Sequence, residues 1–113
     1  MSASLAGKSE WLVLIPDHEG VLKKRMEVRP LHFAALSQKE YFSMGGGLLE
    51  DPPKEGEPLK LNGSAVMTYA ASREEVMEQL KDDIYVTSGV WDLSKVQIYP
   101  FKCAFRKELS VRQ

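Results

Sequence analysis

The pattern of apolar and polar residues along the chain predicts four strands. The first run, residues 11–15, is apolar at consecutive positions, as in a central strand that is covered on both faces, and it ends at Pro16. Turn residues or charged segments bound the other three runs, which lie at residues 41–44, 61–70 and 95–105.

The first predicted helix covers residues 21 to about 40. Its spacing makes four apolar side chains available for a buried stripe, namely Leu22, Met26, Phe33 and Leu36. Pro30 lies inside this segment and lacks an amide donor, and it disfavours a helical conformation at the residue before it. We therefore expect a kink or a break near Arg29.

The second predicted helix begins at Ser72, which has the spacing of a capping box with Glu75. The order strand, helix, strand, strand, helix, strand predicts an α+β, ferredoxin-like βαββαβ fold, with an antiparallel sheet and both helices on one face. The other face of the sheet would be uncovered in a single copy, which favours a homodimer formed sheet to sheet. Apolar side chains expected on that face include Trp11, Val13, Met67 or Ile98.

Composition limits the classes of protein and partner. A chain of 113 residues, 43% of them hydrophobic, fits one domain, and we predict a flexible leader at 1–8, a domain at 9–106 and a mobile tail at 107–113. The net charge of -1 provides no field that would attract nucleic acid or an acidic membrane. No apolar run is long enough to span a membrane and the leader lacks the apolar centre of a signal peptide, so we expect a cytoplasmic protein. The single cysteine, Cys103, is expected to be a buried thiol.

The residues with candidate chemistry cluster around the first predicted helix. Asp17 follows the first strand, and Arg25, Arg29 and His32 are spaced by four and then three residues, which places these three on one helical face. One carboxylate, one imidazole and two guanidinium groups could then meet in one cleft. Each also has a structural alternative: Asp17 could begin the helix, the arginines could form solvated ion pairs, and His32 could be a core or surface residue.

Glycine and proline mark two further segments. Gly45-Gly46-Gly47 is expected to be a bend or a pocket wall, because the lysine and hydroxyl residue of a phosphate-binding loop are absent. The proline-rich polar segment 50–58 is long enough to form a flap over a neighbouring site.

With these motifs in order, residues 11–105 resemble the YciI-like, or YCII-related, family. The residues that carry the resemblance are Asp17, Leu22, Arg25, Arg29-Pro30-x-His32, Gly45-Gly46, Gly63-Ser64, Asp83-x-Tyr85, Gly89-Val90 and Pro100-Phe101-Lys102. The resemblance implies a dimeric α/β barrel and a His-Asp site, here His32 and Asp17, in a family that includes a dehydrochlorinase acting on a chlorinated hydroxyhydroquinone. The chain departs from the usual form at Ile84, where proline is common, and at Gly46-Gly47, where glycine-proline is common.

We therefore predict a metal-independent and cofactor-independent lyase or isomerase that acts on a small ring or carbonyl metabolite. Asp17 would orient His32, His32 would transfer a proton, and Arg25 or Arg29 would hold an anionic oxygen of the substrate. Further substrate-binding candidates are Gly45, Gly46, Tyr85 and Trp91. A binding or sensing module that holds a small ligand without converting it is the alternative, and a purely structural dimerisation domain is a third possibility.

Overall fold

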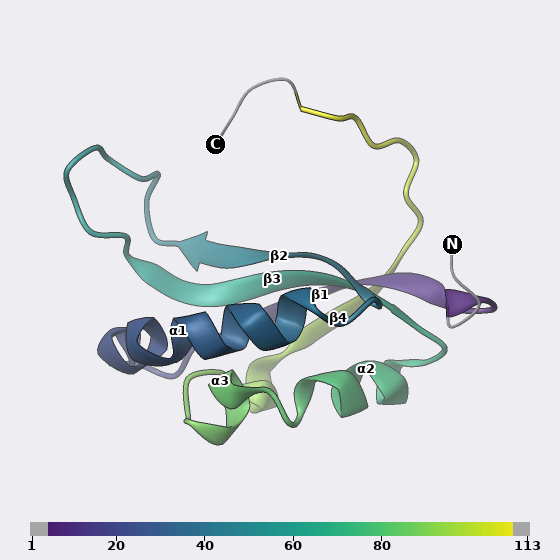
Figure 1. Cartoon of the computed structure of the whole chain (residues 1–113), viewed down its shortest axis with the longest axis horizontal. Coiled ribbons are helices and arrows are strands. Elements are labelled where there is room, and N and C mark those ends of the chain that lie inside the picture. The colour runs from purple at the N-terminus through teal and green to yellow at the C-terminus, as the bar shows by residue number, and fades with distance from the viewer. Residues whose placement is uncertain (1–4, 110–113) are drawn as a thin grey trace.

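A four-stranded antiparallel sheet with helices on one face forms the body of the molecule (Figure 1). The computed structural model describes residues 5–109. Its elements are β1 (Ser9–Pro16), α1 (Leu22–Ser37), β2 (Phe42–Leu49), β3 (Leu61–Ala70), α2 (Arg73–Leu80), α3 (Ile84–Thr87), the short 3-10 helix η2 (Leu93–Lys95) and β4 (Gln97–Phe101). The strand order is β2-β3-β1-β4. The α+β, ferredoxin-like βαββαβ prediction is thus confirmed, with α3 as an addition.

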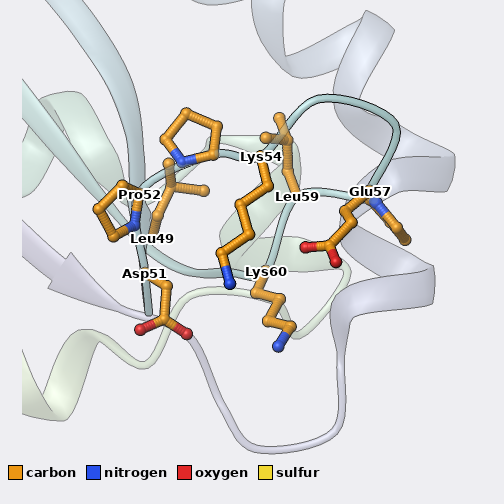
Figure 2. Close-up of a pocket in the computed structure, with 9 residues that line it drawn as sticks. Leu49, Asp51, Pro52, Lys54, Glu57, Leu59 and Lys60 are labelled. Carbon is orange, nitrogen blue, oxygen red and sulfur yellow. The ribbon is translucent and has the colours of Figure 1, made fainter.

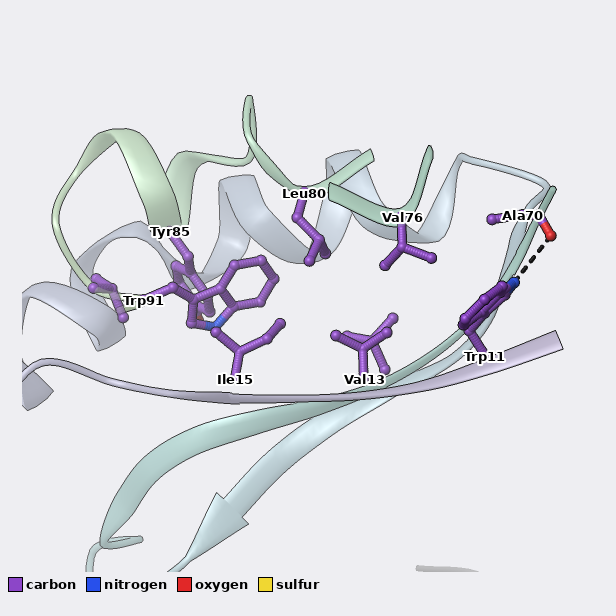
Figure 3. Close-up of a cluster of buried hydrophobic side chains, with 10 residues drawn as sticks. Trp11, Val13, Ile15, Ala70, Val76, Leu80, Tyr85 and Trp91 are labelled. Carbon is purple, nitrogen blue, oxygen red and sulfur yellow. Dashed lines mark hydrogen bonds between the residues drawn. The ribbon is translucent and has the colours of Figure 1, made fainter. Parts of the chain in front are cut away.

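The hydrophobic core lies between the sheet and the helices (Figure 3). Val13 and Ile15 of β1 are fully buried, as are Val76 and Leu80 of α2. Trp11 also points to this side, where its Nε1–H donates to the carbonyl oxygen of Ala70 at 2.9 Å. The prediction that Trp11 and Val13 lie on the uncovered face is therefore wrong, and Ile98 likewise packs against the core.

The opposite face of the sheet is covered by no helix of residues 5–109 (Figure 1), and most of its side chains are apolar. Side chains alternate between the two faces of a strand, so the residues out of phase with Trp11, Val13 and Ile15 face this side. Register then assigns to it Leu12, Leu14, Met44, Leu48, Met67, Tyr99 and Phe101. Met44 and Tyr99 are about half exposed, at 53% and 47%. Met67 was predicted on this face, and its register with Leu12 places it there.

Helix α1 differs from its predicted form in two ways. It continues through Pro30 to Ser37, so of the two expected alternatives near Arg29, a kink or a break, the break is absent. Its expected apolar stripe is also wrong, because Met26 and Phe33 are 46% and 66% exposed. Instead α1 turns Arg25 toward the sheet, and that residue is 4% exposed.

Glycines and capping residues shape three other segments. The three glycines 45–47 lie within β2, so they form part of a strand and not a bend. Ser72 accepts a hydrogen bond from the amide of Glu75, which confirms the predicted start of α2. Asp83 caps α3 in the same way by accepting from the amide of Tyr85 at 2.8 Å. A polar side chain thus fixes the start of each of these two helices.

The segment that joins β2 to β3 folds back on itself and encloses a small cavity (Figure 2). Lys54, Glu57 and Lys60 are among the residues around it. Its volume of about 20 Å³ is enough for roughly one water molecule, so it is too small for a metabolite.

An ion pair ties each terminal segment of the described chain to the body of the molecule. Leu5 is buried, and Lys8 forms an ion pair with Glu75 of α2. After β4, Arg106 pairs with Glu10 of β1 at 3.0 Å. The thiol of Cys103 is not buried as predicted but partly exposed, because β4 ends at Phe101. The outer parts of the predicted leader and tail, residues 1–4 and 110–113, lie outside the described residues. Within 5–109, no helix has the length and apolar character needed to cross a membrane.

Candidate functional site

A slot of about 140 Å³ opens between α1 and β2, with β3 and α3 contributing to its walls. Six of the eight predicted site residues line it, and Asp17 and Trp91 do not. The residues that line it are Arg25, Arg29, His32, Phe33, Leu36, Gly45, Gly46, Gly47, Ser64, Val66 and Tyr85. The glycine segment therefore forms a pocket wall, as one of the two predicted alternatives stated.

The imidazole of His32 is held by a carboxylate and by an aromatic ring. Its Nδ1 lies 2.7 Å from Oδ1 of Asp83, and its ring stacks on Tyr85 with a centroid distance of 3.8 Å and an interplanar angle of 9°. The edge of Trp91 approaches the same ring at 5.2 Å. Because a carboxylate accepts hydrogen bonds, Nδ1 carries the proton and Nε2 of a neutral His32 has the free lone pair. The side chain is 12% exposed and reaches the slot.

The predicted pairing of His32 with Asp17 is wrong, because the carboxylate at His32 belongs to Asp83. Asp17 instead receives both of its hydrogen bonds from Nη1 of Arg25, at 2.8 Å and 2.9 Å. Burial raises the pKa of Asp17, and the charge and hydrogen bonds of Arg25 act in the opposite direction. The side chains of this pair are each 4% exposed, and Asp17 is not among the residues that line the slot.

Arg25 links the slot to the core through a third side-chain hydrogen bond. Its Nη2 donates to the hydroxyl of Ser64 at 2.9 Å, and the same hydroxyl accepts from Nε1 of Trp91 at 3.0 Å. Trp91 is only 2% exposed and supports the slot from behind without lining it. The charge of Arg25 is therefore already matched by Asp17, while the position of its guanidinium is fixed by Ser64.

Tyr85 lies at the centre of the site. Its ring contacts His32 and also lies 4.8 Å from the guanidinium carbon of Arg25. Burial raises the pKa of Tyr85, so its hydroxyl remains neutral through the physiological range, although Arg25 and Arg29 oppose the shift. The hydroxyl is buried and has no hydrogen-bond partner among residues 5–109. Tyr85 thus supplies a rigid aromatic wall against which His32 is held.

Arg29 brings an unmatched positive charge to the slot. It lines the slot, and no ion pair ties it to any other residue in the described part of the chain. Arg25 is neutralised by Asp17, so the two arginines have different roles. An anionic group in the slot would find its counter-charge at Arg29.

Two residues of the site were missed by the sequence reasoning as functional groups. Asp83 and Ser64 were named only within the family motifs Asp83-x-Tyr85 and Gly63-Ser64, with no role in the site. The available signal was the position of Asp83 two residues before Tyr85. A carboxylate that caps a helix by accepting one hydrogen bond can accept another from a neighbouring side chain. Within the described range, no group of three or more His, Cys, Asp or Glu side chains is placed to hold a metal ion.

Comparison with known proteins identifies relatives over nearly the whole chain. The model of the YCII-related domain matches residues 9–102. The aspercryptin biosynthesis cluster protein B of Emericella nidulans is 34% identical over 106 residues, which cover 90% of this chain and 68% of that protein. The fusaric acid biosynthesis protein 2 of Gibberella fujikuroi is 36% identical over 96 residues, which cover 82% of this chain and 92% of that protein.

A solved enzyme structure has a similar fold. It is the 5-chloro-2-hydroxyhydroquinone dehydrochlorinase from Burkholderia phenoliruptrix in complex with 2,5-dihydroxybenzoquinone, with a TM-score of 0.69 and 22% sequence identity. The match covers 82% of this chain and 93% of that one. At this identity the likeness concerns the fold.

Proposed function

Because the chain belongs to the YCII-related domain family, we propose that it is a cofactor-independent lyase or isomerase in which His32 and Asp83 form the acid/base pair. The observation that carries the proposal is the hydrogen bond from Nδ1 of His32 to Asp83 at the wall of an open slot. It leaves Nε2 to exchange a proton with a bound molecule. Relatives that are biosynthesis proteins, and a neighbour that is a dehydrochlorinase, support small-molecule chemistry.

The proposed reaction starts with removal of a proton by Nε2 of His32. The proton comes either from a carbon beside a carbonyl group or from a hydroxyl group of a ring in its keto tautomer. In the first case the C–H bonding electrons form a new C=C bond; in the second the O–H bonding electrons form a C=O bond and the ring double bond shifts to the carbon that carries the leaving group. In an elimination, the leaving group departs with its own bonding electrons and the imidazolium passes its proton to solvent; in an isomerisation, the imidazolium returns the proton to a different atom. Asp83 stabilises the imidazolium between these steps.

Arg29 would bind the anionic oxygen that such a substrate carries or develops. The earlier alternative, Arg25, is less suited because Asp17 already neutralises it and Ser64 fixes it. A guanidinium group at the slot favours enolate, phenolate or carboxylate oxygen over neutral groups.

We also propose that two copies pair through the open face of the sheet. Apolar side chains that are half exposed in one copy, such as Met44, Tyr99 and Phe101, would become buried there. The slot lies on the helix side of the same sheet, so pairing would leave its wall residues in place.

Anaerobic incubation with 5-chloro-2-hydroxyhydroquinone tests the reaction, with chloride release and solvent-deuterium incorporation as the two measurements. A panel of hydroxylated rings and cyclic ketones extends the deuterium measurement to substrates without a leaving group. We expect the wild type to catalyse exchange or elimination on at least one compound, and His32→Gln to lose about 10²- to 10⁴-fold in rate. His32→Gln should retain the wild-type circular dichroism spectrum.

Binding of a panel compound without chloride release or deuterium exchange would instead favour the binding or sensing module. A His32→Gln protein that turns over as fast as the wild type would eliminate His32 as the proton carrier. If His32→Gln unfolds, the milder Asp83→Asn variant replaces it, since Asn can still cap α3.

A further inference from the structure

Beyond β4 the chain continues as an extended segment, residues 102–109, on the open side of the sheet. Figure 1 shows this segment, coloured yellow-green to yellow, on the side of the sheet opposite the helices. It contains no helix, strand, turn or bend. Phe105 and Leu109 are 76% and 72% exposed, more than any other large apolar side chain of residues 5–109. Together with the open face they form an extended apolar surface of the kind that another molecule covers.

Arg106 ties this segment to the open face. Its Nη2 donates to both carboxylate oxygens of Glu10, at 3.2 Å and 3.0 Å. Glu10 is one position out of phase with Trp11 and pairs with Tyr69 and Phe101, so its side chain lies on the open face. The Glu10 side chain is only 8% exposed. The segment therefore shields a carboxylate on this face.

The neutralisation of Glu10 determines whether the open face can be covered. Glu10 is the one charged residue among the strand positions that register assigns to this face. Burying a carboxylate without a cation is strongly unfavourable, so a second molecule would not cover an unmatched Glu10. Arg106 supplies the cation, and the hydroxyl of Ser43 donates a further hydrogen bond at 3.3 Å. Arg106 is itself 56% exposed, so in a single copy the pair contributes little to stability.

The direction of Arg106 also fixes the direction of its neighbours. Side chains alternate between two sides of an extended chain. Arg106 points to its own sheet, so Phe105 and Leu109, at odd-numbered positions, point away from it. Their high exposure agrees with this orientation. A second copy that pairs through the open face would lie on that side.

We propose that residues 102–109 form an arm of a dimer interface, in which Phe105 and Leu109 pack against a second copy of this chain while Arg106 neutralises Glu10. This inference rests on the proposed pairing through the open face and adds a segment outside the sheet to it. A second copy suits the surface because each copy carries the same arm beside the same apolar face. In a two-fold dimer every contact of the arm occurs twice.

Two exposed positions of the arm provide matched variants. Phe105→Ser removes an apolar side chain that is 76% exposed in a single copy, so the fold should remain intact. We expect the dissociation constant of the dimer, measured by sedimentation velocity over a dilution series, to rise about 10²-fold or more, because the side chain is buried twice. Glu108→Ser changes a residue on the same side as Arg106 and should leave the dissociation constant at the wild-type value.

The ion pair is tested by removing one charge and then both. Arg106→Gln leaves Glu10 without its cation and should raise the dissociation constant about tenfold or more. Glu10→Gln/Arg106→Gln has no unmatched charge and should recover most of the wild-type affinity. In the monomeric Tyr99→Glu protein, adding Arg106→Gln should leave the melting temperature unchanged, because the pair is largely exposed in a single copy.

Cys103 reports on the arm without any substitution. It is the single cysteine of the chain and is partly exposed. We expect its alkylation by iodoacetamide to slow as the wild-type protein is concentrated through the dissociation constant. Over the same concentrations the rate in Phe105→Ser should stay constant, because that variant remains monomeric.

Equal dissociation constants for Phe105→Ser and the wild type, no recovery in the double variant, or equal alkylation of monomer and dimer would each overturn the inference. A wild type that stays monomeric would overturn the arm together with the pairing. Failure of the proposed enzymatic function looks different. A dimer that shows all the expected shifts in a protein without turnover would retain this inference and refute the acid/base mechanism.

Discussion

Two substitutions of Asp83, the hydrogen-bond partner of His32, can separate its contribution to catalysis from its contribution to folding stability. Oδ1 of Asp83 accepts from two groups, Nδ1 of His32 at 2.7 Å and the backbone amide of Tyr85 at 2.8 Å. Asparagine retains an oxygen that can cap α3, but it lacks the charge that stabilises an imidazolium. Its amide group can also donate to Nδ1, and this would place the ring proton on Nε2.

The magnitudes follow from these two bonds. Asp83→Ala loses the cap, worth about 1 kcal/mol, and leaves the buried Nδ1 of His32 unpaired, which costs about 1–3 kcal/mol. We therefore expect a loss of about 2–4 kcal/mol in the free energy of unfolding for alanine. Asparagine keeps the cap, so it should lose only about 1 kcal/mol, or a fall in Tm of about 4–8 °C. The rate of proton transfer in Asp83→Asn should nevertheless fall about 10²- to 10⁴-fold.

Asp92 offers a matched control. It caps the short helix η2 by accepting from the amide of Ser94 at 3.1 Å, and its Oδ2 lies 3.8 Å from Nδ1 of His18. Asp92→Asn therefore makes the same chemical change at a similar cap beside the other histidine, outside the slot. Its rate of deuterium exchange should equal that of the wild type.

Two measurements check the reasoning. Long-range ¹H–¹⁵N correlation spectra report the tautomer of His32 without any substrate, and solvent-deuterium exchange on an active panel compound reports the rate. We expect the Nδ1–H tautomer in the wild type. An Nε2–H tautomer in the wild type, or equal rates for Asp83→Asn and the wild type, would refute the assigned roles.

Two further changes test the ion pair and the assembly. Arg25→Met leaves the Asp17 carboxyl, whose pKa burial already raises from its ordinary value of 3.8, without its cation. A raised folded-state pKa gives stability that is present at low pH and is lost as the pH rises through that pKa. In chemical denaturation, Arg25→Met should therefore lose stability from acid toward neutral pH. The double variant Asp17→Asn/Arg25→Met should not show this pH dependence. Tyr99→Glu places a charge on the open face of the sheet and should convert a dimer to monomers in sedimentation velocity. Leu31→Glu, at an exposed position of α1, should leave the dimer intact. A wild-type protein that sediments as a monomer would contradict the proposed pairing.

Local patterns predicted the fold well because each element carries its own signal. An apolar run beside turn residues marks β3, and Ser72 and Glu75 mark the start of α2. The shared helical face of Arg25, Arg29 and His32 was also predictable, since helix geometry alone places residues four and three apart on one side. The slot accordingly contains all three.

The partner of His32 was not predictable by the same reasoning. Asp83 is 51 positions away, and its approach depends on α3, a single turn of helix that the sequence analysis did not predict. Asp17 follows the first strand as predicted, but it pairs with Arg25, eight positions further along. Spacing defines a face of an element, while the choice between two carboxylates depends on how the elements pack together.

Because α1 turns polar side chains inward, substitutions on this helix affect its packing and the site together. This helix contacts the rest of the molecule through Arg25 and His32, with Val28 packed against the core, while Met26 faces outward. Alterations to those two polar groups therefore weaken anchorage of the helix as well as altering reactivity. Strand β2 is exposed along most of its length and contributes little to the core, so new ligand preferences can be acquired there with the least penalty to the structural framework.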